Sequence, residues 1–185
     1  ALPLNVSRPL RRVALVGPFS GDDPVAKQAM MGGYSPGVPA NGITTLRASL
    51  LERGVTVDVS VGCGAGVGGP SASPADFDKA VDLAGAVTTD AVIAMLGTVS
   101  CGCCGRCGNG EAGDRMSLEP EGRQLELLAA LINATQAASR ASGKPAVPVI
   151  VILLHGRPLS FEGPTSVGLS RRTEALPFGD TPVLE

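Results

Sequence analysis

Apolar residues fall into short runs typical of strands and longer stretches with helical spacing. Three runs are almost continuously apolar, as in strands buried on both faces, and a fourth alternates apolar with polar residues. The predicted strands are 11–17, 55–61, 91–96 and 149–154. The last of them, VIVILL, follows Pro148 and is the most uniformly apolar, so we expect it at the centre of a sheet.

Helical spacing of apolar residues fills the intervals between these strands. The predicted helices are 43–53, 74–87 and 118–142, while 26–31 is a short apolar run that ends at Gly32 and Gly33. The longest helix has an apolar side formed by Leu125, Leu128, Leu131 and Ile132. Thr44 or Thr45 can cap the helix 43–53, and Ser117 can cap the longest, because hydroxyl oxygens accept the first free backbone N–H groups.

This alternation of strand and helix predicts the fold class and the domain limits. The pattern is α/β, with a mainly parallel sheet between helices on both faces, which makes a three-layer α/β/α sandwich. We expect the sandwich to occupy residues 1–160 and an irregular tail to occupy 161–185. Within the sandwich, residues 63–74 are almost entirely Gly, Ala, Ser and Pro, which predicts a flexible connection.

Length, charge and composition narrow the function classes. A chain of 185 residues fits one domain with a real core. A net charge of −2, no Trp and one Tyr argue against nucleic-acid binding, and few aromatics argue against a self-sufficient sugar site. No apolar run reaches the length of a membrane span, about 18 residues. The first residues lack the pattern of a signal peptide, so we expect any such peptide to be already removed or never part of the chain.

The stretch 108–128 is the first place to look for chemistry, because it follows a predicted strand and leads into the longest helix. Loops at the carboxyl ends of parallel strands are where ligands meet such folds. Glu111 can donate a proton to a leaving-group oxygen if burial raises its pKa, or it can be a solvated charge. Asp114 and Arg115 suit a structural ion pair or turn better than catalysis.

Two further features carry possible chemistry. A cluster of cysteines precedes the loop and fits a zinc site, a local disulfide or an insertion that binds no metal; its members are Cys101, Cys103, Cys104 and Cys107. A second metal-binding knuckle is absent from the sequence, which weakens the zinc interpretation. His155 is the only histidine and ends the last strand, where a packing role is favoured over a polar group facing a site.

Seven stretches in one order cover roughly residues 2–160. They are LPL with RRVALVGP, GGYSPGVP with ITTLRASL, VTVDVSVGCG, FDKAV, AVIAMLG, EAGDRMSLEPEGRQLELL and VIVILLHGRP. Together they resemble the C-terminal α/β sandwich domain of glycoside hydrolase family 3, particularly its β-xylosidase and β-glucosidase branch. This resemblance supports the same fold as the residue pattern.

The resemblance implies retaining hydrolysis of a terminal β-linked sugar, a xyloside or a glucoside, with no metal or other cofactor. Glu111 matches the family's acidic loop best and would be the acid/base, while a β/α barrel elsewhere would supply the Asp nucleophile. Asp114, Arg115 and His155 would contact the carbohydrate. The family also favours a secreted or extracellular location.

Departures from the family leave two main functions open. The sequence holds no barrel, it places Cys101 to Gly108 where the xylosidase branch has a second Glu, and it does not continue into a further strand after Arg157. The chain is therefore either the sandwich part of a family 3 glycosidase or a catalytically inactive module in a larger assembly. A nucleotide or flavin binder is a third class that rests on fold analogy alone, since no GxGxxG follows a strand.

Overall fold

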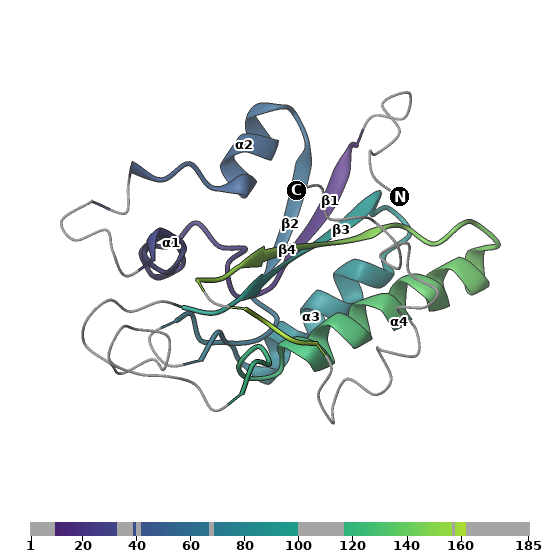
Figure 1. Cartoon of the computed structure of the whole chain (residues 1–185). Coiled ribbons are helices and arrows are strands. Elements are labelled where there is room, and N and C mark those ends of the chain that lie inside the picture. The colour runs from purple at the N-terminus through teal and green to yellow at the C-terminus, as the bar shows by residue number, and fades with distance from the viewer. Residues whose placement is uncertain are drawn as a thin grey trace, which may run out of the picture.

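The computed structural model describes residues 10–32, 39, 42–66, 69–99, 117–156 and 158–161. Within these ranges the predicted strands and helices are present in the predicted order, and one further helix follows the first strand (Figure 1). The elements are β1 (Arg12–Val16), α1 (Pro24–Met31), α2 (Leu46–Glu52), β2 (Thr56–Ser60), α3 (Pro74–Gly85), β3 (Ala91–Gly97), α4 (Gln124–Ser142) and β4 (Val149–Leu154). Apart from Phe161, the predicted tail 161–185 lies outside the described residues.

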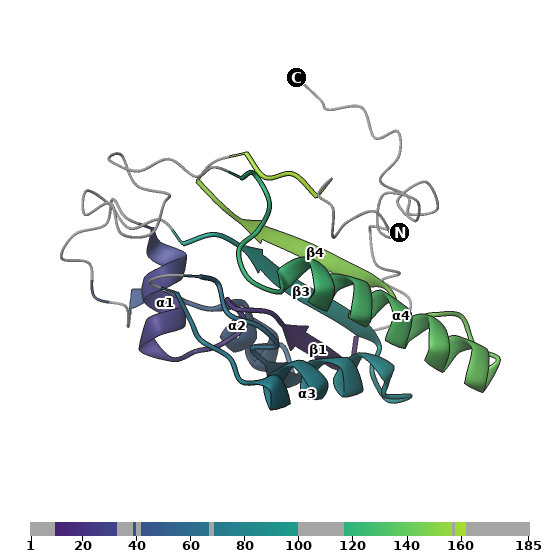
Figure 2. The same cartoon turned by 90° about the horizontal axis from the view of Figure 1, so that it is seen from below.

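The described strands form one parallel sheet in the order β2-β1-β3-β4. Helices α1 and α2 cover one face, while α3 and α4 pack side by side on the other (Figures 1 and 2). This arrangement confirms the predicted α/β sandwich. The chain moves outward from β1 to β2 and then reverses to place β3 on the other side of β1.

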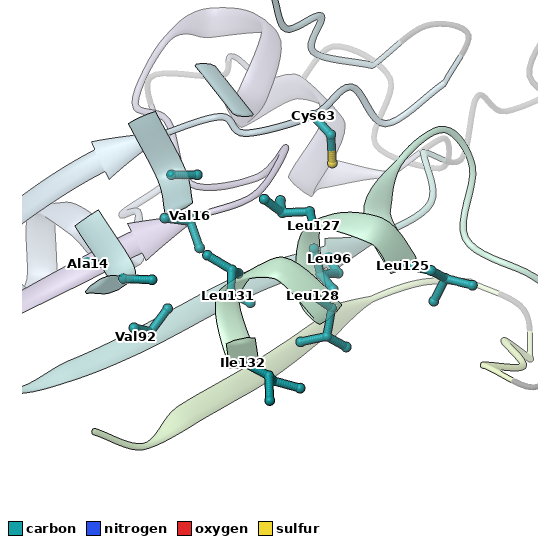
Figure 3. Packing of buried hydrophobic residues seen from close by; sticks show 13 residues of the cluster. Ala14, Val16, Cys63, Val92, Leu96, Leu125, Leu127, Leu128, Leu131 and Ile132 are labelled. Atoms are coloured by element: carbon teal, nitrogen blue, oxygen red, sulfur yellow. The ribbon is translucent and has the colours of Figure 1, made fainter. Parts of the chain in front are cut away.

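Alternating side chains of the central strands build two cores. Val13, Leu15, Ile93 and Met95 face α1 and α2. Ala14, Val16, Val92, Ala94 and Leu96 face α3 and α4, where the predicted apolar side of α4 meets them (Figure 3). Every residue of β1 after Arg12 and every residue of β3 is buried, because both faces are covered.

Polar residues fix where the first three helices begin. Thr45 caps α2 by accepting a hydrogen bond from Ala48 N at 3.1 Å, as predicted. Asp23 caps α1 and is followed by Pro24 at the first helical position, a start that the short apolar run at 26–31 did not predict. Ser73 and Asp76 form a reciprocal capping box on α3.

The longest helix begins six residues later than predicted, at Gln124 rather than Leu118. Ser117 does not cap it; its hydroxyl accepts a hydrogen bond from Glu119 N at 3.1 Å. Pro120 follows, and a proline restricts the preceding residue to extended conformations, which keeps this segment out of the helix. The segment before α4 is thus a separate connection, joined through Leu118 O to Ser160 N at 2.9 Å.

The prediction that VIVILL is a central strand was wrong. Among the described strands, β4 stands last in the sheet and pairs with β3. Its residues are mostly half-buried, and Leu153 is 39% exposed. A continuous apolar run indicates side chains that favour burial, but it carries no information on whether both backbone edges of the strand are paired.

The predicted flexible connection at 63–74 was also wrong for the residues that the structure describes there. Cys63 and Ala65 are buried, and Ala65 N donates to Pro70 O at 3.1 Å. At Gly66 an added Cβ would lie 1.5 Å from Glu121 Oε2, so the absence of a side chain allows the two segments to touch. The small residues of this segment allow close packing, although the same composition is typical of a flexible linker.

Asp22 ties the loop after β1 to the start of α2. Its carboxylate accepts hydrogen bonds from the Thr45 hydroxyl and the Arg47 guanidinium. Partial burial alone would raise the pKa of Asp22, but these bonds outweigh it and hold the pKa below its ordinary value. The ionised carboxylate therefore stabilises the folded state.

We expect Asp22→Asn to lower the free energy of unfolding by about 1 kcal/mol at pH 7, because the pair is only partly buried. A carboxyl with a lowered folded pKa contributes stability above its unfolded pKa, about 4, and loses it as pH falls through the folded value. The difference between the variant and the original chain should shrink over that acidic window in urea titrations. Asp78→Asn, on the exposed side of α3, is the matched control; a constant difference at all pH values would contradict the explanation.

Candidate functional site

The two adjacent strands β1 and β3 flank the point where the chain reverses direction across the sheet. In open α/β sheets, ligands bind beyond the carboxyl ends of the strands at such a reversal. The loop after β1 starts at Gly17, and the segment that includes Glu111 leaves β3 after Gly97. The candidate functional site is therefore this carboxyl edge of the sheet.

Buried polar contacts hold the loop after β1 in place at this edge. Gly17 N donates to Ser60 O at 3.1 Å, and Ser20 Oγ donates to the same oxygen at 3.2 Å. Ser60 Oγ in turn donates to Asp76 O at 2.7 Å in the first turn of α3. The neighbouring Phe19 is 1% exposed, so the first residues of this loop form part of the folded core.

The end of β3 is held from two sides. Gly97 has φ +147° and lies opposite Leu154 of β4. On its other side, Gly97 N donates to Gln124 Oε1 at 2.8 Å, and Gln124 Nε2 donates back to Gly97 O at 2.8 Å. Gln124 is completely buried and also donates to Glu121 O at 2.9 Å. The last residue of β3 is thus fastened to both β4 and the start of α4.

A third segment, 62–66, packs beside the start of α4. Burial raises the pKa of the Cys63 thiol to about 12, so this free cysteine stays protonated and poorly nucleophilic at neutral pH. Nearby, the Arg123 guanidinium stacks over the Phe77 ring at 4.2 Å and bonds Glu126 at 2.7 Å. Cys63 belongs to the core, and we assign it no reaction.

Glu111, Asp114 and Arg115, the predicted polar site residues, lie outside the described residues. The four clustered cysteines also lie outside them: Cys101, Cys103, Cys104 and Cys107. The structure describes the chain on either side of this segment, up to the buried Val99 and again from the exposed Ser117.

His155 immediately follows β4 at the same edge of the sheet. Its side chain is exposed, so the expected packing role was wrong. The residue before it, Leu154, packs against the core under α1 and α2. The strand therefore ends at the boundary between core and solvent, and His155 lies on the solvent side.

Gln124 is the important residue at this edge that the sequence interpretation missed. A signal for it exists, since Gln124 stands four positions before Leu128 and seven before Leu131, which places it on the buried side of the helix. A polar residue at a core position must find hydrogen-bond partners, and such a position marks a fixed contact. The expected helix start at Leu118 hid this signal.

A groove of 310 Å³ lies at the opposite, amino edge of the strands. It is lined by the end of α3, the second half of α4 and the residues that lead into β3 and β4, among them Asp90, Thr135 and Lys144. The rule for parallel sheets places ligands at the other edge, so we do not assign this groove to the site.

In the part of the chain that the structure describes, no group of three or more His, Cys, Asp or Glu side chains is placed to hold a metal ion. Nor do the helices within the described ranges include one long and apolar enough to cross a membrane.

Comparison with known proteins agrees with this architecture. The family model described as "Glycosyl hydrolase family 3 C-terminal domain" matches residues 1–168. A curated protein from Formosa agariphila named "Beta-xylosidase" is 33% identical over 161 residues, which is 86% of this chain. The matched region is only 19% of that relative, so the chain spans about a fifth of its length.

Proposed function

The chain belongs to the glycosyl hydrolase family 3 C-terminal domain family, and on this basis we propose that it supplies the acid/base group of a retaining β-glycosidase. Glu111 is the residue to which we give this role. The observation that carries the proposal is topological: the segment with Glu111 leaves β3, one of the two strands that flank the reversal point of the sheet. In this proposal, the Glu111 carboxyl group acts at the edge where such folds present ligands.

The proposed reaction divides the work between two carboxyl groups. In the first step, an aspartate on a β/α barrel attacks the anomeric carbon while the Glu111 carboxylic acid donates its proton to the departing oxygen. In the second step, the Glu111 carboxylate takes a proton from water, and the resulting hydroxide attacks the glycosyl–enzyme ester and releases the aspartate. The two inversions at the anomeric carbon give net retention. Glu111 must begin protonated, so the assembled site must raise its pKa.

The proposed substrates are terminal β-linked sugars, with β-xylosides first and β-glucosides second. The similar protein from Formosa agariphila is named a beta-xylosidase, and this name supports the choice. We include Asp114, Arg115 and His155 as polar groups that would hydrogen-bond sugar hydroxyls. Of these, only His155 is described, and it is exposed at the proposed edge.

The proposed partner is the barrel that carries the nucleophile, on the same or another polypeptide. Its existence is supported by the length of the relative, of which this chain matches 19%. The described part of this domain offers the carboxyl edge of a sheet as one wall of a site. In this proposal, the barrel supplies the opposite wall and most sugar contacts.

The test is hydrolysis of aryl β-xylosides and β-glucosides by the assembly of this domain with its barrel, with and without Glu111→Gln. Glutamine keeps the shape of the side chain but cannot exchange the proton, so we expect kcat/KM to fall by about 10²- to 10⁴-fold for a poor leaving group. Glu126→Gln, an exposed carboxyl on α4, is the control. Unchanged turnover in Glu111→Gln would remove this residue from the mechanism, and an inactive original assembly would favour the structural module.

A further inference from the structure

Gln124 joins two parts of the chain that stand on either side of the segment with Glu111. Its amide makes both possible bonds to the backbone of Gly97, at 2.8 Å each, as a neighbouring strand would. The remaining amide hydrogen is donated to Glu121 O at 2.9 Å. One side chain therefore fixes the end of β3 relative to the turn that starts α4.

The surroundings leave this side chain no alternative arrangement. Gln124 is 0% exposed, and its amide oxygen and both of its amide hydrogens take part in hydrogen bonds. Gly97 is also confined by Leu154 on its other side, in register within the sheet. Glu121 is confined by its contact with Gly66. The connection thus links two positions that are each packed against another segment of the described chain.

We propose that Gln124 is a positioning residue for the glycosidase reaction. It sets the distance between Gly97 and Glu121, the two residues that stand before and after the segment with Glu111. This inference rests on the proposed function of Glu111. The contacts that carry it lie wholly within the described residues. A catalytic acid gains most when its donor atom is held at the departing oxygen, and a displacement of about 1 Å can cost about 10²-fold in rate.

The closing experiment uses leaving groups that differ in their need for a proton. In the assembly with the barrel, Gln124→Met should lower kcat/KM for phenyl β-xyloside by about 10- to 100-fold. It should change kcat/KM for the 2,4-dinitrophenyl β-xyloside by less than about 3-fold, because that phenolate departs without a proton. The control is Thr135→Val. It removes a different buried side-chain hydrogen bond of α4, which the Thr135 hydroxyl donates to Ile132 O at 2.9 Å.

Equal losses for both substrates in Gln124→Met, matched by Thr135→Val, would mean a purely structural role and overturn the inference. If Glu111→Ala shows the leaving-group dependence and Gln124→Met does not, the positioning role alone fails. If Glu111→Ala lacks that dependence as well, the proposed function fails. Should Gln124→Met not fold, Gln124→Glu replaces it. A glutamate keeps an oxygen that accepts from Gly97 N, but it lacks the NH₂ group that donates to Gly97 O and Glu121 O. Gln124→Glu should show the same selective loss, with faster amide hydrogen exchange at Gly97 in the full chain; equal losses there overturn the inference too.

Discussion

Replacing Gly97 with alanine is expected to lower the free energy of unfolding by more than about 4 kcal/mol. A Cβ at this position would lie 1.8 Å from Leu154 O and 2.7 Å from Leu154 C, which are backbone atoms of the paired strand. The backbone also has φ +147°, a conformation that side chains disfavour. Relief would require β3 and β4 to separate at the carboxyl edge, with loss of the hydrogen bond from Thr98 N to Leu154 O at 3.0 Å. Chemical denaturation of the full chain measures the effect.

Gly143→Ala is the matched control for Gly97→Ala. Gly143 ends α4 with φ +68°, and a Cβ there would meet nothing within 4 Å. Its substitution should cost only the strain of a left-handed residue, about 1–2 kcal/mol. Similar losses in both variants would contradict the close contact between Gly97 and β4.

Shortening Leu131 to alanine is expected to cost about 2–5 kcal/mol of unfolding free energy. Leu131 is 0% exposed and projects from α4 toward the sheet, in the core shared with α3 (Figure 3). The truncation removes apolar contacts and leaves a cavity that rigid neighbours on β1 and β3 cannot fill. The midpoint of urea unfolding should fall, with little change in the dependence on urea concentration.

Leu51→Ala makes the same chemical change on α2, where the side chain is 44% exposed. We expect it to change the unfolding free energy by less than about 1 kcal/mol, since much of the leucine already meets solvent. A comparable loss in Leu51→Ala and Leu131→Ala would contradict the burial of Leu131 in the core between α4 and the sheet.

The periodicity of apolar residues predicts the strands and helices of this fold well, because burial against neighbouring elements determines where apolar residues stand in each of them. The runs at β1 and β3 are apolar since helices cover both faces of these strands, and the spacing of Leu125, Leu128 and Leu131 reflects one buried side of α4. The place of β4 as the last of the described strands is not predicted by such reasoning. Backbone pairing, unlike burial, leaves no mark on the side chains of a strand.

The sequence predicts the carboxyl edge of the sheet as the candidate site, but it does not predict the contacts that hold this edge in place. Loops after parallel strands follow from the β–α alternation alone. The pairing of Gln124 with Gly97, by contrast, joins residues far apart in the chain. Gly66 packs on Glu121, although it belongs to a segment whose composition is that of a linker. Long-range contacts of this kind depend on the assembled fold. The roles of Glu111, Asp114 and Arg115 stay predictions, since these residues lie outside the described ranges.

The central claim is that Glu111 is the acid/base group, and product analysis with azide tests it most directly. In Glu111→Ala, the glycosyl–enzyme intermediate formed from a dinitrophenyl β-xyloside lacks the base that activates water, so it should accumulate. Azide needs no base to attack, and we expect it to restore turnover and to yield the β-xylosyl azide. Release of free xylose at the original rate, with no azide adduct and no effect of azide on turnover, would contradict the account.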